Sequence, residues 1–258
     1  MIKISIIFLM MSFVSCSMLT RDSSSAFKNY KRDMTSHDYA KHLEAITLKF
    51  VEQNKRNIRR ISSTTDEYIK YLIERISQNN EIVLSKRERV DLYIVKDRRP
   101  FYFSMPDGNI FISSQMFIKY FKSEDIFISA FTSELAKSTL WIYQKQVLIP
   151  REDYRIENMI KFAKLPFAEK VKLNNLSYEI MKRSGYDPAA QLLWLQTQNR
   201  NTVDFSFMYE VPSEMAREEY YLKNYIVNKG DESTITYERN SSKLFYKLKQ
   251  KIEKAYEN

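Results

Sequence analysis

The sequence predicts a helix-rich α+β fold, with one small antiparallel sheet in a single domain. Most of the chain places apolar residues at three- and four-residue spacing, which is the pattern of amphipathic helices. Short runs rich in β-branched and aromatic residues, which are typical of strands, gather between positions 90 and 113. No internal repeat is visible, and 44% of the 258 residues are hydrophobic, which is enough for one substantial core.

Two helices are expected before the first strand. Residues 37–59 carry an apolar stripe at helical spacing, and Thr35 or Ser36 is suited to cap the first turn. Residues 66–78 repeat the pattern after a polar break at 62–65.

Three apolar runs predict strands, at residues 90–95, 101–105 and 109–113. The last two flank a Pro-Asp-Gly turn at 106–108, which favours a hairpin. A small antiparallel sheet is the expected assembly.

The rest of the chain is expected to be helical. Pro188 and Pro212 stand where a first helical turn accepts proline, and Gly185 is suited to end a helix. A Thr-Ile-Thr-Tyr run at 234–237 is compatible with a short strand. The expected helices cover residues 116–121, 124–144, 154–162, 167–184, 188–198, 212–228 and 241–256.

One stretch suggests chemistry, in the middle of the apolar helix at 126–141. It reads Ser-Glu-Leu-Ala-Lys from Ser133 to Lys137. A zinc peptidase helix reads H-E-x-x-H, with two imidazoles one turn apart and the Glu as general base. Here Glu134 is present, while Ser133 and Lys137 take both ligand positions.

Three further stretches accompany this helix: F-S-M-P-D-G-N-I-F-I-S at 103–113, G-Y-D-P at 185–188 and V-P-S-E-M-A-R at 211–217. Together they resemble metallopeptidase family 48, the HtpX- and BepA-type gluzincins. That family has a strand F-x-x-P-x-G-x-I-x-[IV] before its active helix, then a helix ending in G-Y-D-P-x-A, then H-P-x-x-x-x-R. The resemblance implies a zincin-like helical domain over residues 36–258.

The departures from the family concern the metal ligands. Counted back from Gly185, the family's third ligand, a Glu in E-x-D, falls on Lys172, and its Asp falls on Asn174. The His of H-P falls on Val211, whereas Arg217 is retained. The resemblance therefore implies the fold, with none of the three expected ligands in place.

Ammonium groups at ligand positions repel a divalent cation, so we expect no bound zinc and no hydrolysis by the zinc mechanism. We expect Glu134 to pair with Lys137, Lys172 or both, the alternative being solvated charges on a helix face. The histidines, His37 and His42, are five residues apart and share a helix face poorly, which favours surface or capping roles.

The family resemblance also implies a peptide-binding cleft, in which an extended peptide lies along an edge strand above the active helix. Arg217 would bind a carboxylate or carbonyl there, or make a structural ion pair. The alternative is an edge covered by the chain itself. The candidate edge-strand residues are Asn109, Ile110, Phe111 and Ile112.

The amino terminus predicts export. Residues 1–15 join a lysine to an apolar run too short to span a bilayer, and resemble a lipoprotein signal peptide. Cys16, the single cysteine, would be the lipidated residue, and Ser17 after it favours the outer membrane, facing the periplasm. Residues 16–35 read as a flexible tether. The alternative is an ordinary signal peptide, with Cys16 incidental.

The formal net charge of +9 favours solubility and attraction to anionic lipid headgroups. Nucleic acid is a poor partner for an exported chain, and no basic stripe of a recognised binding module is present.

Three functions follow. The leading interpretation is a lipid-anchored pseudopeptidase of the cell envelope that binds a polypeptide client without cutting it and uses no cofactor. The first alternative is an active zinc metalloendopeptidase with a non-standard ligand set. The second is a structural lipoprotein with a filled cleft.

Overall fold

The computed structural model describes residues 35–81, 89–145, 154–209, 211, 213–230 and 241–256. The expected signal peptide, Cys16, nearly all of the tether and the Thr-Ile-Thr-Tyr run at 234–237 lie outside these residues. None of the helices in the described ranges is both long and apolar enough to cross a membrane.

The four strands form one sheet in the order β1-β2-β4-β3. The strands are β1 (Ile58–Ser62), β2 (Asp91–Val95), β3 (Tyr102–Met105) and β4 (Asn109–Ser113). β1 with β2 and β3 with β4 pair antiparallel, but β2 and β4 pair parallel. The helix-rich α+β class is confirmed, whereas the expectation of an antiparallel sheet is wrong because the two inner strands run in the same direction.

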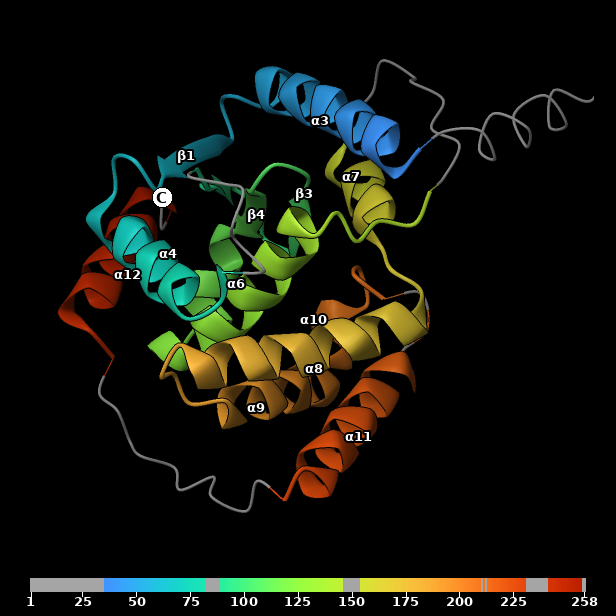
Figure 1. Cartoon of the computed structure of the whole chain (residues 1–258). Coiled ribbons are helices and arrows are strands. Elements are labelled where there is room, and N and C mark those ends of the chain that lie inside the picture. The colour runs from blue at the N-terminus through green and yellow to red at the C-terminus, as the bar shows by residue number, and fades with distance from the viewer. Residues whose placement is uncertain are drawn as a thin grey trace, which may run out of the picture.

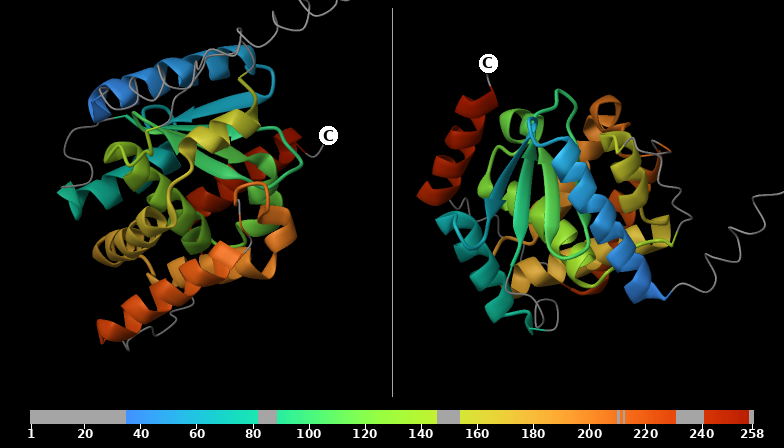
Figure 2. Two further views of the ribbon diagram at one scale, coloured as in Figure 1. Left: turned by 90° about the vertical axis from the view of Figure 1, so that its right-hand side faces the viewer. Right: turned by 90° about the horizontal axis from the view of Figure 1, so that it is seen from above.

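Helices cover both faces of the sheet (Figures 1 and 2). On one face, α3 (Ser36–Gln53) and α7 (Ile156–Ala163) pack against the aromatic rings of Tyr93, Phe103 and Phe111. Successive side chains of a strand point to opposite faces. The aliphatic side chains of β2 and β4 therefore pack on the other face, against α4 (Glu67–Gln78), α6 (Glu124–Thr139) and α12 (Lys243–Tyr256).

Helix α6 is the centre of the second layer. Ser123 accepts a hydrogen bond from the Ile126 amide and caps the helix, as its position predicts. Residues 126–138 are all buried, because the sheet lies on one side and α8 (Phe167–Arg183) and α9 (Ala189–Arg200) on others. Any charged side chain in this stretch must find its partner inside the protein.

The remaining elements complete the helical layer. η1 (Met116–Tyr120) is a π-helix that follows β4, and α10 (Thr202–Phe205) is a single turn after α9. α11 (Ser213–Asn228) packs across α8 and α9.

Two expected boundaries are wrong. The first helix ends at Gln53 instead of residue 59, and β1 takes the residues beyond it. Helix α6 ends at Thr139 instead of residue 144.

Candidate functional site

A cavity of about 90 Å³ lies where the predicted catalytic helix faces β3 and the surrounding helices. Its walls combine charged, amide and apolar side chains. The lining residues are Tyr102, Phe103, Ser133, Glu134, Lys137, Ile160, Ala163, Lys164, Leu165, Lys170, Leu173, Asn174, Gln191, Trp194, Leu195, Met208, Tyr209 and Glu218.

A buried ion pair stands at the place of the H-E-x-x-H motif. The Lys137 Nζ lies 2.5 Å from Glu134 Oε2, and the two side chains are 5% and 8% exposed. Residues three apart on a helix lie on one face, so the sequence spacing itself brings the two charges together. The predicted pairing of Glu134 with Lys137 is confirmed.

A second charged group faces this pair from α8 and α11. Lys170 Nζ lies 2.8 Å from Glu214 Oε2 and 3.6 Å from Glu218 Oε1. Asn174 Nδ2 donates a hydrogen bond of 2.9 Å to Glu218. Burial raises the pKa of Glu218, and the nearby Lys170 ammonium opposes that rise.

Amide and hydroxyl groups connect the second charged group to Ser133, the residue before Glu134 on α6. Gln191 Nε2 donates to Ser133 Oγ at 3.3 Å and to Asn174 Oδ1 at 3.2 Å. The Ser177 hydroxyl donates to Gln191 Oε1 at 3.1 Å. The network thus crosses α6, α8 and α9, and holds their facing surfaces together through neutral side chains.

The third expected ligand position is wrong. Lys172 is 73% exposed, pairs with Glu169 at 2.9 Å and does not reach Glu134. The α8 lysine that lines the cavity is Lys170, four residues before Asn174 and therefore on the same helix face. This spacing of four was the signal available in the sequence. Lys172 is only two positions from Asn174, so the two side chains point to opposite sides of the helix and cannot both face the cavity.

Arg217 lies outside the cavity. Its guanidinium stacks on the Phe167 ring, with Cζ 4.0 Å from the ring centroid, and the side chain is exposed. Val211, at the place of the family's His, is 48% exposed. Among the described residues, Arg217 therefore makes a cation–π contact at the surface. It neither enters the expected cleft nor forms the expected ion pair there.

The expectation that Asn109, Ile110, Phe111 and Ile112 form an edge strand is wrong. β4 lies between β2 and β3, so both of its backbone edges are already paired. The edge strand on this side is β3, and α7 packs beside it (Figure 1). Phe103 in β3 is only 2% exposed, so the resting structure offers no free strand edge here.

The donor set does not fit the zinc ion that the resemblance implies. A catalytic zinc site needs three neutral or anionic ligands. The three positions hold the Ser133 hydroxyl and the Lys137 and Lys170 ammonium groups. Within the described ranges, no group of three or more His, Cys, Asp or Glu side chains is arranged to hold a metal. His37 instead packs on Trp141, with ring centroids 5.2 Å apart.

No protein-family model matches the chain, and no curated protein sequence matches it.

Proposed function

We propose that this protein is a pseudopeptidase of metallopeptidase family 48 type, exported and lipid-anchored in the cell envelope, which binds a polypeptide client without zinc-dependent hydrolysis. The buried Glu134–Lys137 ion pair carries the proposal. In a zinc peptidase the glutamate takes a proton from a metal-bound water. Here an ammonium group neutralises that glutamate from the position of a metal ligand.

The cavity limits what the client can place there. Ligand pockets commonly measure about 300–1,000 Å³, whereas this cavity measures about 90 Å³. It therefore suits one inserted side chain rather than an extended peptide. The apolar lining residues Phe103, Trp194 and Leu195 favour an apolar side chain.

A structural lipoprotein with a filled cleft is the second candidate, and two observations favour it. The cavity is small, and α7 covers the β3 edge through Met159, Ile160 and Ala163, which belong to the buried aromatic cluster. This candidate predicts that no client reaches the cavity.

Introducing metal ligands at the three positions tests the part of the proposal that concerns the missing zinc site. The variant Ser133→His, Lys137→His, Lys170→Glu places two imidazoles and a carboxylate at the three positions. The wild type is expected to purify without zinc. The variant is expected to bind one zinc per chain and to gain thermal stability on zinc addition, because zinc binds the folded state. The matched control carries Lys172→Glu in place of Lys170→Glu, and its expected zinc affinity is markedly lower.

Stoichiometric zinc in the wild type, with casein cleavage that a chelator stops, would instead establish the active enzyme. Failure of the triple variant to bind zinc more tightly than its control would remove the zincin-like interpretation of the site.

Photo-crosslinking separates client binding from a filled cleft. A photoreactive residue at position 164, at the cavity wall, is expected to crosslink added unfolded casein, whereas one at position 172, on the outer face of α8, is not. Absent or equal crosslinking at the two positions would favour the structural lipoprotein.

A further inference from the structure

Strand β1 is the uncovered edge of the sheet. It pairs with β2 on one side only, and in the described ranges no other strand pairs with it. Its burial runs from half-buried Ile58, through exposed Arg59 and Arg60, to buried Ile61 and Ser62. Helix α4 contacts the strand, and the buried cluster that joins them includes Ile61. Arg59 and Arg60 are therefore the residues of β1 that are exposed to solvent, while Ile58 packs in part against the aromatic cluster on the α3 face.

The register shows which backbone groups point outward. The ladder is bracketed by hydrogen bonds from Lys96 N to Asn57 O and from Ser63 N to Val90 O. In an antiparallel pair, alternate residues direct their N–H and C=O to the partner strand. Arg59 therefore bonds to β2, while the N–H and C=O groups of Ile58 and Arg60 point away from the sheet.

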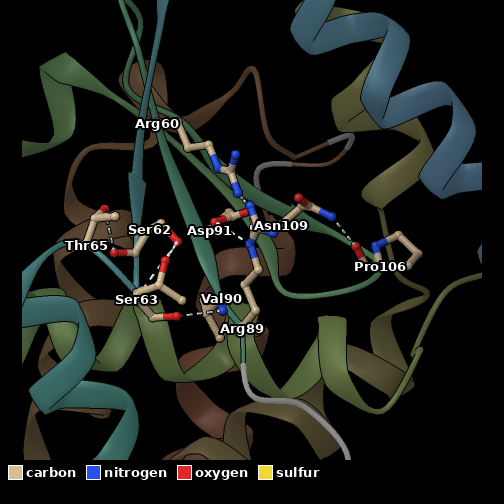
Figure 3. Close-up of polar contacts among 10 residues, drawn as sticks. Arg60, Ser62, Ser63, Thr65, Arg89, Val90, Asp91, Pro106 and Asn109 are labelled. Carbon is tan, nitrogen blue, oxygen red and sulfur yellow. Dashed lines mark hydrogen bonds and ion pairs between the residues drawn. The ribbon is translucent and has the colours of Figure 1, made fainter.

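Side chains hold this edge in place. Figure 3 shows Arg60 and Arg89 pointing toward Asp91, at N···O distances of 2.7 and 3.3 Å. Ser63 Oγ accepts a hydrogen bond from the Val90 amide at 3.0 Å. The edge is thus a pre-formed template, and a partner strand would not have to order it.

Positive charge surrounds the edge. Lys55, Arg56 and Arg59 are exposed, and no carboxylate of the described residues forms an ion pair with any of them. A shallow groove at the same end of the strand is lined by Asn57, Arg98 and Tyr256, among others. Burial raises the pKa of Tyr256 in the wall of this groove, and the positive charge of Arg59 opposes that rise.

A charged edge also prevents pairing between copies of this chain, because like charges would face each other. The same charges admit a strand of opposite sign. Residues opposite one another in a sheet interact, and opposite charges stabilise the pairing. Self-pairing is therefore disfavoured at an edge that remains available to an acidic strand.

We infer that β1 binds an extended acidic polypeptide segment, which adds to the sheet as a fifth strand. Its backbone bonds to Ile58 and Arg60, and its carboxylates pair with Lys55, Arg56 and Arg59. This surface is separate from the cavity beside Glu134, so the inference holds whether or not that cavity binds a client.

Fluorescence anisotropy of the full chain with a labelled ten-residue peptide of alternating Glu and Val tests the inference. The variant Lys55→Glu, Arg59→Glu is expected to weaken binding about tenfold or more, as for loss of close charge pairs. The control Arg200→Glu, Lys223→Glu makes the same change in net charge at exposed positions elsewhere and is expected to change affinity less than about twofold. A second peptide, with proline in place of each valine, keeps the charges but loses the N–H donor of every second residue, and is expected to bind about tenfold more weakly.

Three outcomes would overturn the inference. The first is equal weakening by both charge-reversed variants, which indicates non-specific attraction. The second is equal binding of the proline-containing peptide. The third is that neither peptide binds. This outcome includes the case in which the chain binds phosphatidylglycerol vesicles instead, and the variant Lys55→Glu, Arg59→Glu abolishes that binding.

Discussion

The two edges of the sheet differ in how far other parts of the chain cover them. At the β3 edge, α7 covers the strand and Phe103 is 2% exposed. At the β1 edge, no strand of the described ranges pairs with the outer side, and the Arg60 side chain is 42% exposed. In the family that the sequence resembles, the edge above the active helix is expected to receive a peptide. Here that edge is closed, and the opposite one is open.

The charges at the two edges differ in the same way. Beside β3, Glu134 and Lys137 are removed from water and depend on each other. Beside β1, the arginines are hydrated, and each contributes little to folding. Charged side chains are thus buried and paired with each other at one edge, whereas at the other edge they remain exposed to solvent.

The largest expected effect comes from breaking the buried pair. Lys137→Met leaves the Glu134 carboxylate buried and without its counter-charge, at an expected cost of about 3–5 kcal/mol in the free energy of unfolding. Replacing both partners, as Glu134→Gln with Lys137→Met, is expected to recover most of that loss because no lone charge remains. Urea unfolding of the wild type and the two variants measures both quantities.

Lys172→Met is the matched control, since this lysine is exposed on the outer face of α8. It is expected to change stability by less than about 0.5 kcal/mol. If Lys137→Met changed stability as little as Lys172→Met does, water would reach the Glu134–Lys137 pair, and the β3 edge would be as open as the β1 edge.

A smaller effect on the free energy of unfolding is expected from replacing Glu218, a buried carboxylate whose partners are Asn174 and Lys170. Burial raises its pKa in the folded protein above the ordinary carboxyl value of 4.5. The folded state therefore holds the proton more tightly than the unfolded state. This contribution is most favourable below that ordinary value, and it declines as pH rises through the raised pKa.

Glu218→Gln cannot titrate, and its amide oxygen can still accept the bond from Asn174. The stability of this variant relative to the wild type is expected to rise between about pH 4 and about pH 7. Urea unfolding at several pH values measures the difference. A constant difference across that range would show that Glu218 ionises as an exposed carboxyl does.

Local signals in the sequence predict the local structure well. Thr35 and Ser123 cap the helices that follow them, because a short polar side chain before an apolar periodic run satisfies free amides. Gly108 completes the turn before β4 with φ of +72°, and a Cβ there would lie 2.7 Å from the Arg89 carbonyl oxygen. These features depend on neighbouring residues, which the sequence displays directly.

Features that depend on distant parts of the chain were missed. β1 reads Ile-Arg-Arg-Ile-Ser, which lacks a strand's alternation and continues the helical pattern before it. That β4 is an inner strand follows from the parallel pairing of β2 and β4, and no local signal fixes that choice. The third ligand position was assigned to Lys172 by counting back from a motif, so Lys170 was missed. Counting one helical turn back from Asn174 identifies Lys170, because residues four apart lie on the same helix face.

The smallest effect on folding is expected at the open edge. Arg60→Ala removes the 2.7 Å contact with Asp91, a pair in which the arginine is largely hydrated. The expected loss is about 0.2–1 kcal/mol, because Asp91 keeps Arg89 at 3.3 Å and the outward backbone groups of β1 are unchanged. Urea unfolding measures this loss, and the acidic peptide should then bind the variant within about threefold of the wild type, since Arg60 is not among the residues that pair with its carboxylates. A loss in stability comparable to that of Lys137→Met would mean that the Arg60–Asp91 pair is shielded from water, and the contrast between the two edges would fail.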